Sequence, residues 1–372
     1  MSLNRFVVNW QPILCVLALV TTCVSPSWAQ DARSEQFQTL FDEWKLVLKE
    51  LRDTYAEYHI APDSELDRLS EQFNRAVERG ELLMPKLRDA GIASYNASPN
   101  ADRELTRFLL SLAMDNIEKD RYEDAKLITD ALLAGNVDEK VIYDLAGTVA
   151  FAMNDFDTAE THLKEAEALG VLSKGADYLP LVEECKTAWA KEQEIRQAEA
   201  EADDLPRVKL QTSKGDIVLE LFENEAPDTV GNFVNLVEKG FYDGLTFHRV
   251  LPNFMAQTGC PKGDGTGDAG YKIYCECYQE NHRNHFRGSL SMAKGNQRDT
   301  GGSQFFLTFV PTAHLNGQHT VFGRVIEGLD VLAEIQRRDP SKPEDSAIEP
   351  DKIVKAEVLR KRDHEYSPNK VR

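Results

Sequence analysis

The sequence predicts a multidomain chain in which an all-α N-terminal part precedes a mainly β C-terminal part. Apolar residues recur at helical spacing before residue 201, whereas short alternating runs begin at Arg207. A 34-residue repeat lies in the helical part. Residues 30–204 contain 39 Asp and Glu against 20 Lys and Arg, and residues 205–372 contain 23 against 22. The length of 372 residues also favours two domains over one.

The first 29 residues predict a secretory signal peptide. Arg5 is the only charged residue before Asp31, an apolar core covers residues 13–20, and residues 27–29 form a small-x-small cleavage site. We therefore expect residues 1–29 to be removed and the mature protein to be exported, either periplasmic or secreted, without a stable membrane span. An uncleaved membrane anchor and acylation of Cys23 are the two alternatives.

Residues 30–104 are expected to form a pair of antiparallel helices. Two runs with helical spacing are separated by residues 61–64, in which Asp63 or Ser64 can cap the second helix. The apolar positions of the two runs are Phe37, Leu40, Phe41, Trp44, Val47, Leu48 and Leu51, followed by Leu66, Leu69, Phe73, Ala76 and Val77.

Residues 105–200 contain the repeat and a helical extension. Residues 120–125 recur as residues 154–159, and this offset of 34 positions is the period of a tetratricopeptide repeat (TPR), a helix–turn–helix unit. Such units stack on one another to bury their apolar faces. We expect two TPR-like helical hairpins and a further helix, over residues 105–138, 139–172 and 178–200. Stacking is the primary expected role, and a peptide-binding groove on the concave face is the alternative.

An acidic linker is expected at residues 201–206. It ends at Pro206, which disfavours helical geometry in the residue before it. The acidity of the helical part argues against a nucleic-acid partner, because binding a polyphosphate requires clustered Lys and Arg. A solvated helical surface is the simplest interpretation. An acidic face that docks a basic protein partner is the alternative.

The second part is expected to span residues 207–362 and to be followed by a polar tail over residues 363–372. Residues 208–212 and 217–221 flank a Ser-Lys-Gly-Asp turn and predict a β-hairpin. Further elements are expected in order: a helix from Ala226 to Gly240, short strands with glycine-rich loops, a helix over 329–335 and a strand over 353–359.

Three blocks in this part carry the strongest functional signal. They read Phe-His-Arg-Val-Leu-Pro-Asn-Phe-Met-Ala-Gln-Thr-Gly at 247–259, Gly-Ser-Gln-Phe-Phe at 302–306 and His-Leu-Asn-Gly-Gln-His-Thr-Val-Phe-Gly at 314–323. They set one arginine among large apolar side chains and offer neither a nucleophile nor an acid–base pair. In order and spacing they resemble the signature blocks of cyclophilins, the barrel-shaped peptidyl-prolyl isomerases, and the resemblance extends over residues 207–361.

This resemblance implies a closed, eight-stranded antiparallel barrel with one helix over each open end. Closure would leave no free sheet edge. It also implies a peptidyl-prolyl cis-trans isomerase that acts on proline-containing polypeptides, with no cofactor and no metal. In an exported protein the expected role is to accelerate the folding of other exported proteins.

Rotation about an X–Pro bond breaks no covalent bond, but amide resonance sets a barrier of about 18–20 kcal/mol. The resemblance implies that Arg249 lowers this barrier by donating hydrogen bonds toward the prolyl nitrogen and the adjacent carbonyl. A guanidinium suits this task because it is always charged and presents a rigid fork of donors. An interaction that is stronger at the twisted geometry than in either planar isomer accelerates the rotation.

The remaining site residues are also implied by the resemblance. The pocket for the proline ring would be formed by Phe254, Met255, Phe306 and Leu315, with His319 at its edge. The peptide groove would be formed by Gln257, Gln304, Ala293, Lys294, His314 and Gly265. Within these sets the catalytic residues would be Arg249, Gln257, Phe254 and His319.

Taken singly, the same residues have simpler interpretations. Phe254, Met255 and Phe306 would be core residues of a barrel, and Arg249 would be a surface cation. Their joint order favours the pocket.

Two positions depart from the family pattern. His314 stands where cyclosporin-binding cyclophilins carry tryptophan, which puts tight drug binding in doubt. Lys294 replaces a common asparagine, a change that bears on substrate preference.

Four cysteines remain after the signal peptide is removed. An oxidising compartment permits a disulfide from Cys260 to Cys275 or Cys277. Unpaired thiols are the favoured interpretation. A zinc site built from the last two cysteines with His282 and His285 is the weakest interpretation.

Two rival functions belong to other classes. One is a non-catalytic binding protein, in which the helical part supplies the affinity and the barrel captures proline-containing peptides. The other is a scaffold whose repeats drive assembly. In the catalytic interpretation the helical part docks or orients clients, and the presence of Arg249 favours this interpretation over a protein that only binds.

Overall fold

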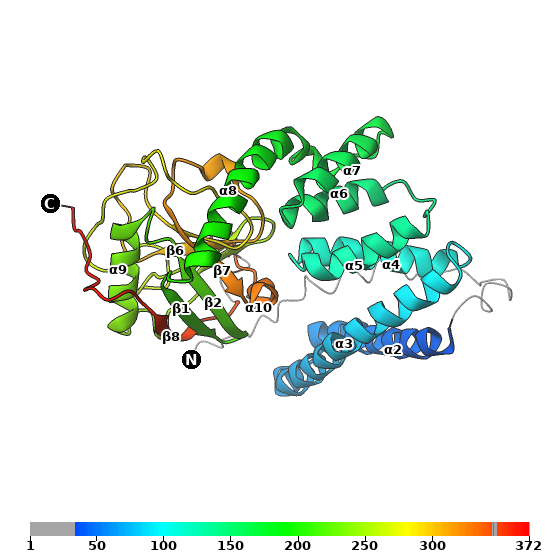
Figure 1. The fold of residues 1–372 in the computed structure, drawn as a ribbon. Coiled ribbons are helices and arrows are strands. Elements are labelled where there is room, and N and C mark those ends of the chain that lie inside the picture. The colour runs from blue at the N-terminus through cyan, green and yellow to red at the C-terminus, as the bar shows by residue number, and fades with distance from the viewer. Residues whose placement is uncertain (1–33, 344, 346–347, 372) are drawn as a thin grey trace.

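The computed structural model describes residues 34–343, 345 and 348–371 (Figure 1). The predicted signal peptide lies outside these residues. Helices occupy the N-terminal part and a curled antiparallel sheet occupies the C-terminal part. This arrangement confirms the predicted order of the two fold classes.

Consecutive helices of the N-terminal part pack in pairs, because each carries one apolar stripe that a neighbour must cover. Phe37, Leu87 and Leu109 are completely buried where α2, α3 and α4 meet. The helices are α2 (Glu35–Ile60), α3 (Asp63–Ala97), α4 (Arg103–Glu118), α5 (Tyr122–Ala134), α6 (Ile142–Ala152) and α7 (Phe156–Ala168).

The sequence repeat is also a repeat of backbone geometry. Helices α5 and α7 each contain 13 residues, and they begin at Tyr122 and Phe156, 34 positions apart. Two residues before each helix the backbone is left-handed, with φ of 60° at Asp120 and 65° at Asn154. The two turns are therefore equivalent, whereas the assignment of the units as TPR-like stays a prediction.

A long helix joins the two parts of the chain. After the 3-10 turns η2 (Lys174–Ala176) and η3 (Leu179–Leu181), helix α8 (Val182–Ala202) runs across the β part (Figure 1). Its acidic side chains do not all face solvent. Glu192 and Glu199 are buried against arginines of the β part.

Arg283 is the centre of this buried contact. Its side chain is 1% exposed, and its guanidinium lies 2.7 Å from Glu192 and 2.5 Å from Glu199. The same guanidinium sits 3.8 Å from the ring centroid of Phe222. Burial pushes the pKa of Glu192 upward, but the hydrogen bonds and charge of Arg283 outweigh burial and hold that pKa below its ordinary value.

The segments predicted as linker and tail are also held by the β part. The residues 201–206 begin in the last turn of α8 and continue with Asp203, which pairs with Arg207 and Arg360. In the tail, Tyr366 is buried, and its hydroxyl donates a hydrogen bond of 2.8 Å to Glu223.

Within the described residues, eight strands form one antiparallel sheet in the order β3-β4-β6-β5-β7-β2-β1-β8. Most of these strands are buried on the face that packs against helix α9 (Pro227–Glu238). Helix α10 (Leu329–Glu334) and the short turn η4 (Ala313–Leu315) complete this part. The strands are β1 (Arg207–Thr212), β2 (Gly215–Leu221), β3 (Arg249–Leu251), β4 (Met255–Thr258), β5 (Ser289–Met292), β6 (Phe305–Thr308), β7 (Val321–Glu327) and β8 (Ile353–Arg360).

The expectation of a closed barrel is wrong, because the described strands form a half-barrel whose edge strands β3 and β8 do not pair with each other. Strand β3 has only three residues, and its outer side is occupied by Arg338, which exchanges two backbone hydrogen bonds with Val250. Irregular backbone spans the remaining gap. Gly244 donates to Ile353, and Phe247 donates to Asp351.

Among the described residues, no helix is both long enough and apolar enough to cross a membrane.

Candidate functional site

The strand register aligns the predicted site residues. Arg249 of β3 pairs with Gln257 of β4, and Gln257 pairs with Phe306 of β6. Phe306 in turn pairs with Ser291 of β5. Directly opposed residues of antiparallel strands project to the same face of a sheet. The register therefore places the side chains of Arg249, Gln257 and Phe306 in one row across the sheet, which we call the aligned row.

Arg249 is half-buried and lies against two of the predicted pocket residues. Its Nη1 is 3.9 Å from the sulfur of Met255, and its guanidinium carbon is 5.8 Å from the ring centroid of Phe254. Within the part of the chain that the structure describes, no carboxylate pairs with this guanidinium. Its N–H groups are therefore available to a bound peptide.

A chain of amide hydrogen bonds fixes the polar side of the site. Nε2 of Gln257 donates to Oε1 of Gln304 over 2.9 Å. Nε2 of Gln304 donates to the carbonyl oxygens of Gly265 and Gly267, each over 2.8 Å. The two predicted glutamines are thus tied to each other and to the glycine-rich loop.

This chain of amides depends on a close approach at Gly259. The residue has a φ of 84°, and a Cβ added there would lie 2.3 Å from the carbonyl oxygen of Ser303. Only glycine tolerates both this conformation and this contact. Because Ser303 precedes Gln304, the close approach of the two backbones at Gly259 sets the position of the Gln304 backbone.

Aromatic rings form the apolar side of the site. The rings of Phe254 and His314 are 5.7 Å apart and tilted by 35°, while Phe306 and His319 meet edge to face at 5.6 Å. Leu315 is half-buried in η4, between the two histidines in the sequence.

His319 is held as a wall of the site. Burial lowers its pKa, and its Nδ1 lies 3.0 Å from the carbonyl oxygen of Met292, to which it donates as the N–H tautomer. The ring is therefore neutral near pH 7. A neutral ring with one nitrogen occupied suits a wall better than a proton carrier.

Ala293 and Lys294 follow β5 beside this row. The N–H of Ala293 donates to the carbonyl of Gln304 over 3.0 Å, which places the predicted peptide-pairing segment next to the predicted groove. The ammonium of Lys294 donates to the carbonyl of Gly295 over 3.3 Å.

His285, which the sequence indicated only as a possible zinc ligand, is a neighbour of the site. Its ring stacks on Phe306 at 5.9 Å with an interplanar angle of 3°. Its two nitrogens lie 2.9 Å from Ser291 and 3.0 Å from Asn316, and burial lowers its pKa to about 3. No spacing rule reveals such a stacked ring, because it reaches the site from an irregular segment.

The disulfide that the sequence permits from Cys260 to Cys275 or Cys277 is not formed, which agrees with the favoured interpretation of unpaired thiols. Cys185, Cys260, Cys275 and Cys277 are all free thiols. Cys260 is buried, and its sulfur accepts a hydrogen bond from the backbone of Gly267 in the glycine-rich loop. The thiols of Cys275 and Cys277 instead hydrogen-bond to each other, which lowers the pKa of Cys275 to about 7.

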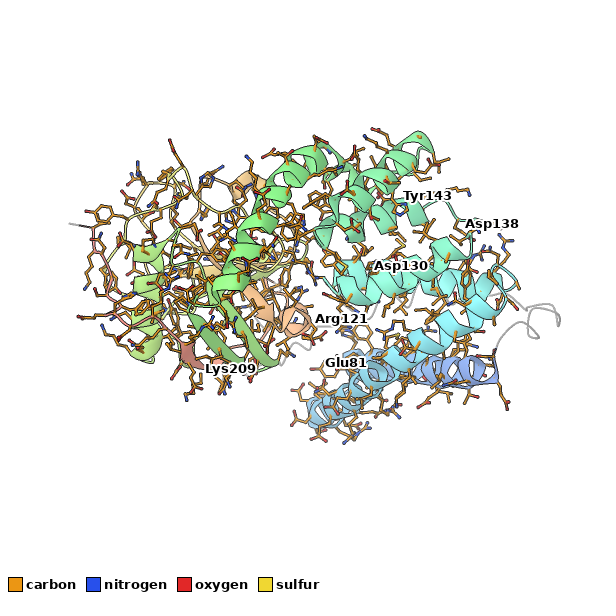
Figure 2. The ribbon with its side chains drawn as sticks, viewed as in Figure 1. Glu81, Arg121, Asp130, Asp138, Tyr143 and Lys209 are labelled. Atoms are coloured by element: carbon orange, nitrogen blue, oxygen red, sulfur yellow. The ribbon has the colours of Figure 1, made fainter. Side chains whose placement is uncertain are left out.

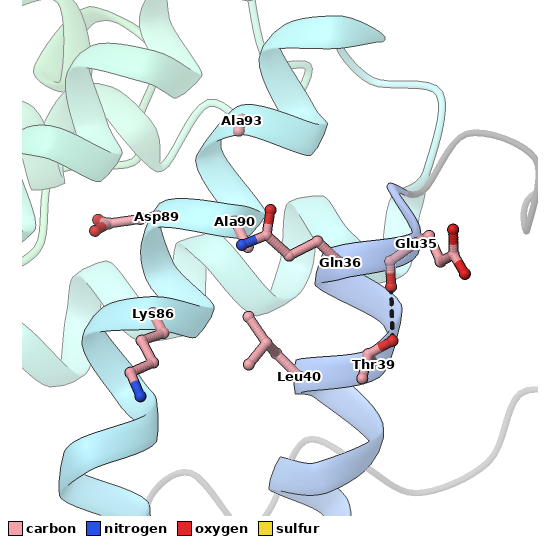
Figure 3. Close-up of a pocket in the computed structure, with 8 residues that line it drawn as sticks. All are labelled: Glu35, Gln36, Thr39, Leu40, Lys86, Asp89, Ala90 and Ala93. Carbon is pink, nitrogen blue, oxygen red and sulfur yellow. Dashed lines mark hydrogen bonds between the residues drawn. The ribbon is translucent and has the colours of Figure 1, made fainter.

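A separate hollow of about 740 Å³ lies between α2 and α3, far along the chain from the aligned row (Figure 3). We call it the α2–α3 hollow. Its rim is polar, and its apolar lining consists of short or half-buried side chains. It is lined by Glu35, Gln36, Thr39, Leu40, Lys86, Asp89, Ala90 and Ala93.

Comparison with known proteins identifies the β part. A family model described as cyclophilin type peptidyl-prolyl cis-trans isomerase/CLD matches residues 207–358. A peptidyl-prolyl cis-trans isomerase of Helicobacter pylori is 55% identical over 132 residues, which cover 35% of this chain and 80% of the relative. Peptidyl-prolyl cis-trans isomerase B of Bacillus subtilis is 52% identical over 126 residues, which cover 34% and 87%.

A crystal structure of a Cryptosporidium parvum cyclophilin type peptidyl-prolyl cis-trans isomerase is 30% identical to the matched region. The match covers 42% of this chain and 99% of that one, with a TM-score of 0.38.

The buried ring of His285 predicts an acid-sensitive contribution to stability. Its folded-state pKa of about 3 lies below the ordinary value of 6.5, so between these values the unfolded chain binds a proton that the folded chain does not. This contribution is therefore complete above about pH 6.5 and is lost as the pH falls toward 3. In His285→Gln, the drop in unfolding free energy from pH 7 to pH 5 should be smaller by about 2 kcal/mol.

Urea unfolding at the two pH values measures this difference. His59→Gln, which changes an exposed histidine, is the matched control. Equal drops in wild type and His285→Gln would contradict the expectation.

Proposed function

The chain belongs to the cyclophilin-type peptidyl-prolyl cis-trans isomerase family and is a peptidyl-prolyl cis-trans isomerase, and we propose that it accelerates X–Pro isomerisation in exported proteins. The substrates of this enzyme class are proline-containing polypeptides. In this proposal the protein helps other proteins to fold outside the cytoplasm. The aligned row around Arg249 carries out the isomerisation.

Arg249 acts on the amide as it twists. The prolyl nitrogen gains a localised lone pair when the C–N bond leaves the plane, and a guanidinium N–H directed at it stabilises that state more than either planar isomer. The observation that carries this proposal is the register, in which Arg249 lies opposite Gln257 and without a carboxylate partner among the described residues.

The surrounding residues hold the peptide while one side of the bond turns. Phe254 is half-buried next to the guanidinium, with Met255 and Phe306 buried beside it, and we assign these three residues to the pocket that receives the proline ring. Gln257 binds the peptide backbone, while its bond to Gln304 keeps it in place. His319 closes the edge as a neutral ring.

Replacement of Arg249 should abolish most of the acceleration. We expect Arg249→Ala to lower kcat/KM by about 10²–10³-fold, the usual cost of losing one donor aimed at a developing charge. Arg249→Lys should recover only part of this loss, because an ammonium lacks the planar fork. A protease-coupled isomerisation assay on a proline tetrapeptide measures both rates.

Arg298→Ala is the matched control. It also removes an arginine from the β part, but the side chain of Arg298 is 64% exposed. It should retain the wild-type rate. Equal rates in wild type and Arg249→Ala would contradict the catalytic proposal and favour the rival, a protein that binds proline-containing peptides without isomerising them.

Export rests on the signal-like N-terminus, with its single Arg5, its apolar core and its cleavage site at Ala29. The mature protein should begin at Gln30. Intact-mass analysis of protein from a bacterial periplasm or culture medium checks this, and a mature chain that still begins at Met1 would contradict cleavage.

The helical part is proposed to dock clients or a protein partner. Its net charge favours basic segments, since residues 30–204 hold 39 acidic against 20 basic residues. The α2–α3 hollow has an apolar floor that includes Leu40 and Ala90, and Lys86 also lines it. Glu35 and Asp89 stand at its rim, with their carboxylates directed away from the space between the helices (Figure 3). An unfolded, basic client segment fits this combination.

Ala93→Arg should weaken docking without affecting chemistry, because it sets a bulky cation in the hollow. We expect the rate with a basic, proline-limited refolding protein to fall about fivefold, while the rate with a tetrapeptide stays unchanged. Ala97→Arg, which adds the same charge to an exposed position of α3 outside the hollow, is the control. Equal refolding rates for both variants would contradict docking in this hollow.

A further inference from the structure

The helical part forms hydrogen bonds to the turn that carries Phe254 of the proposed pocket. Residues 252–254 connect β3, which holds Arg249, to β4, which begins at Met255. Asn253 in this turn has a φ of 55°, in the left-handed region, which asparagine enters more readily than most residues but which is still uncommon outside glycine. Such a backbone persists where the surroundings fix it.

The residues that fix it are Asp120, in the turn before α5, and Tyr122, the first residue of that helix. Oδ1 of Asp120 accepts a hydrogen bond of 2.8 Å from the backbone N–H of Asn253. The hydroxyl of Tyr122 lies 3.1 Å from that same oxygen and 3.3 Å from Oδ1 of Asn253. Asp120 is 1% exposed and Tyr122 is completely buried, so water does not compete for these contacts.

A second path leads from Asp120 to the same turn. Oδ2 of Asp120 accepts a hydrogen bond of 2.7 Å from Arg337. The guanidinium of Arg337 lies 4.4 Å from the ring centroid of Phe309, whose N–H donates over 2.9 Å to the carbonyl of Phe254. Both oxygens of one carboxylate therefore act on the segment that presents Phe254.

The equivalent residue of the next repeat touches the other side of the site. Asn154, 34 positions after Asp120, accepts a hydrogen bond of 3.2 Å from the backbone N–H of Arg287. The neighbouring Phe286 packs against Trp189 of α8 at 4.7 Å. His285, one residue earlier, stacks on Phe306. Two equivalent turns of the helical repeat thus hold the two flanks of the aromatic pocket.

We propose that Asp120 is a positioning residue for peptidyl-prolyl isomerisation, acting from the helical part through Asn253 on Phe254 and Arg249. This inference rests on the proposed roles of Phe254 and Arg249. The carboxylate replaces solvent around a strained turn and sets the direction of the Phe254 ring. A displaced ring would hold the proline away from the guanidinium, and small displacements in such geometry are costly to the rate.

The test uses the full chain with Asp120→Ala. We expect kcat/KM for a proline tetrapeptide to fall about tenfold. With ¹⁵N-labelled phenylalanine and no substrate present, the amide resonance of Phe254 should shift and broaden, because Asn253 loses its acceptor. Loss of stability alone would not displace this resonance in the folded protein.

Arg121→Gln is the matched control. It removes a two-pronged ion pair of 2.7 Å with Glu334 of α10, one residue from Asp120 and at the same junction of helical and β parts (Figure 2). Because α10 carries none of the proposed pocket residues, this variant should keep the wild-type kcat/KM and the wild-type Phe254 resonance. A folded Asp120→Ala that behaves like Arg121→Gln in both measurements overturns the proposal.

Tyr122→Phe decides the matter if Asp120→Ala does not fold. It removes one hydroxyl from a buried ring, and it should lower kcat/KM about twofold to threefold and shift the Phe254 amide. No change in either measurement overturns the proposal. The resonance is read without turnover, so equal rates in wild type and Arg249→Ala would defeat the proposed catalysis and leave this test of positioning intact.

Discussion

The structure depends on one buried guanidinium between helix α8 and the sheet. Arg283 is surrounded by the carboxylates of Glu192 and Glu199 and covered by the ring of Phe222. Removing charges from water is costly, and the cost is met only where each charge finds a partner with good geometry. These ion pairs hold α8 against the β part. The repeat turns at Asp120 and Asn154 contact the same part of the chain beside the proposed pocket.

This arrangement gives the helical repeat two uses. Repeat units stack because each leaves an apolar face uncovered, which is a demand of packing alone. Here the polar turns that follow from the same repeat make contact with a different domain. The left-handed residues Asp120 and Asn154, before α5 and α7, each direct a side-chain oxygen toward the β part. The spacing of the repeat sets the distance between these two oxygens. The proposed pocket is therefore contacted by a part of the chain that contributes none of its proposed residues.

Much of this site could be predicted from the sequence, because its residues lie in short blocks whose order indicates a family. The order of helical and β parts was also predictable, since a change of period marks it at Arg207. Contacts that depend on long-range packing were not. The half-barrel arises because the Arg338 segment occupies the outer side of β3. The thiol of Cys260 is held by its own loop.

His285 and Asp120 illustrate the same limit. Each has an ordinary local sequence, and each gains its importance from a partner that is distant in the chain, Phe306 in one case and Asn253 in the other. For the acidic helix α8, the local sequence wrongly predicted exposure for two glutamates that are buried. A run of glutamates predicts a solvated surface, whereas Glu192 and Glu199 form ion pairs with arginines that are distant in the sequence.

Gly259 has a consequence for how this site can diverge. A methyl group there would collide with the carbonyl of Ser303, so two backbones come closer than any side chain permits. The glutamine pair beyond it inherits its spacing from that proximity. Descendants of this protein can therefore change residues of the proposed groove such as His314, whereas position 259 has to stay glycine, because any side chain there would push the two backbones apart.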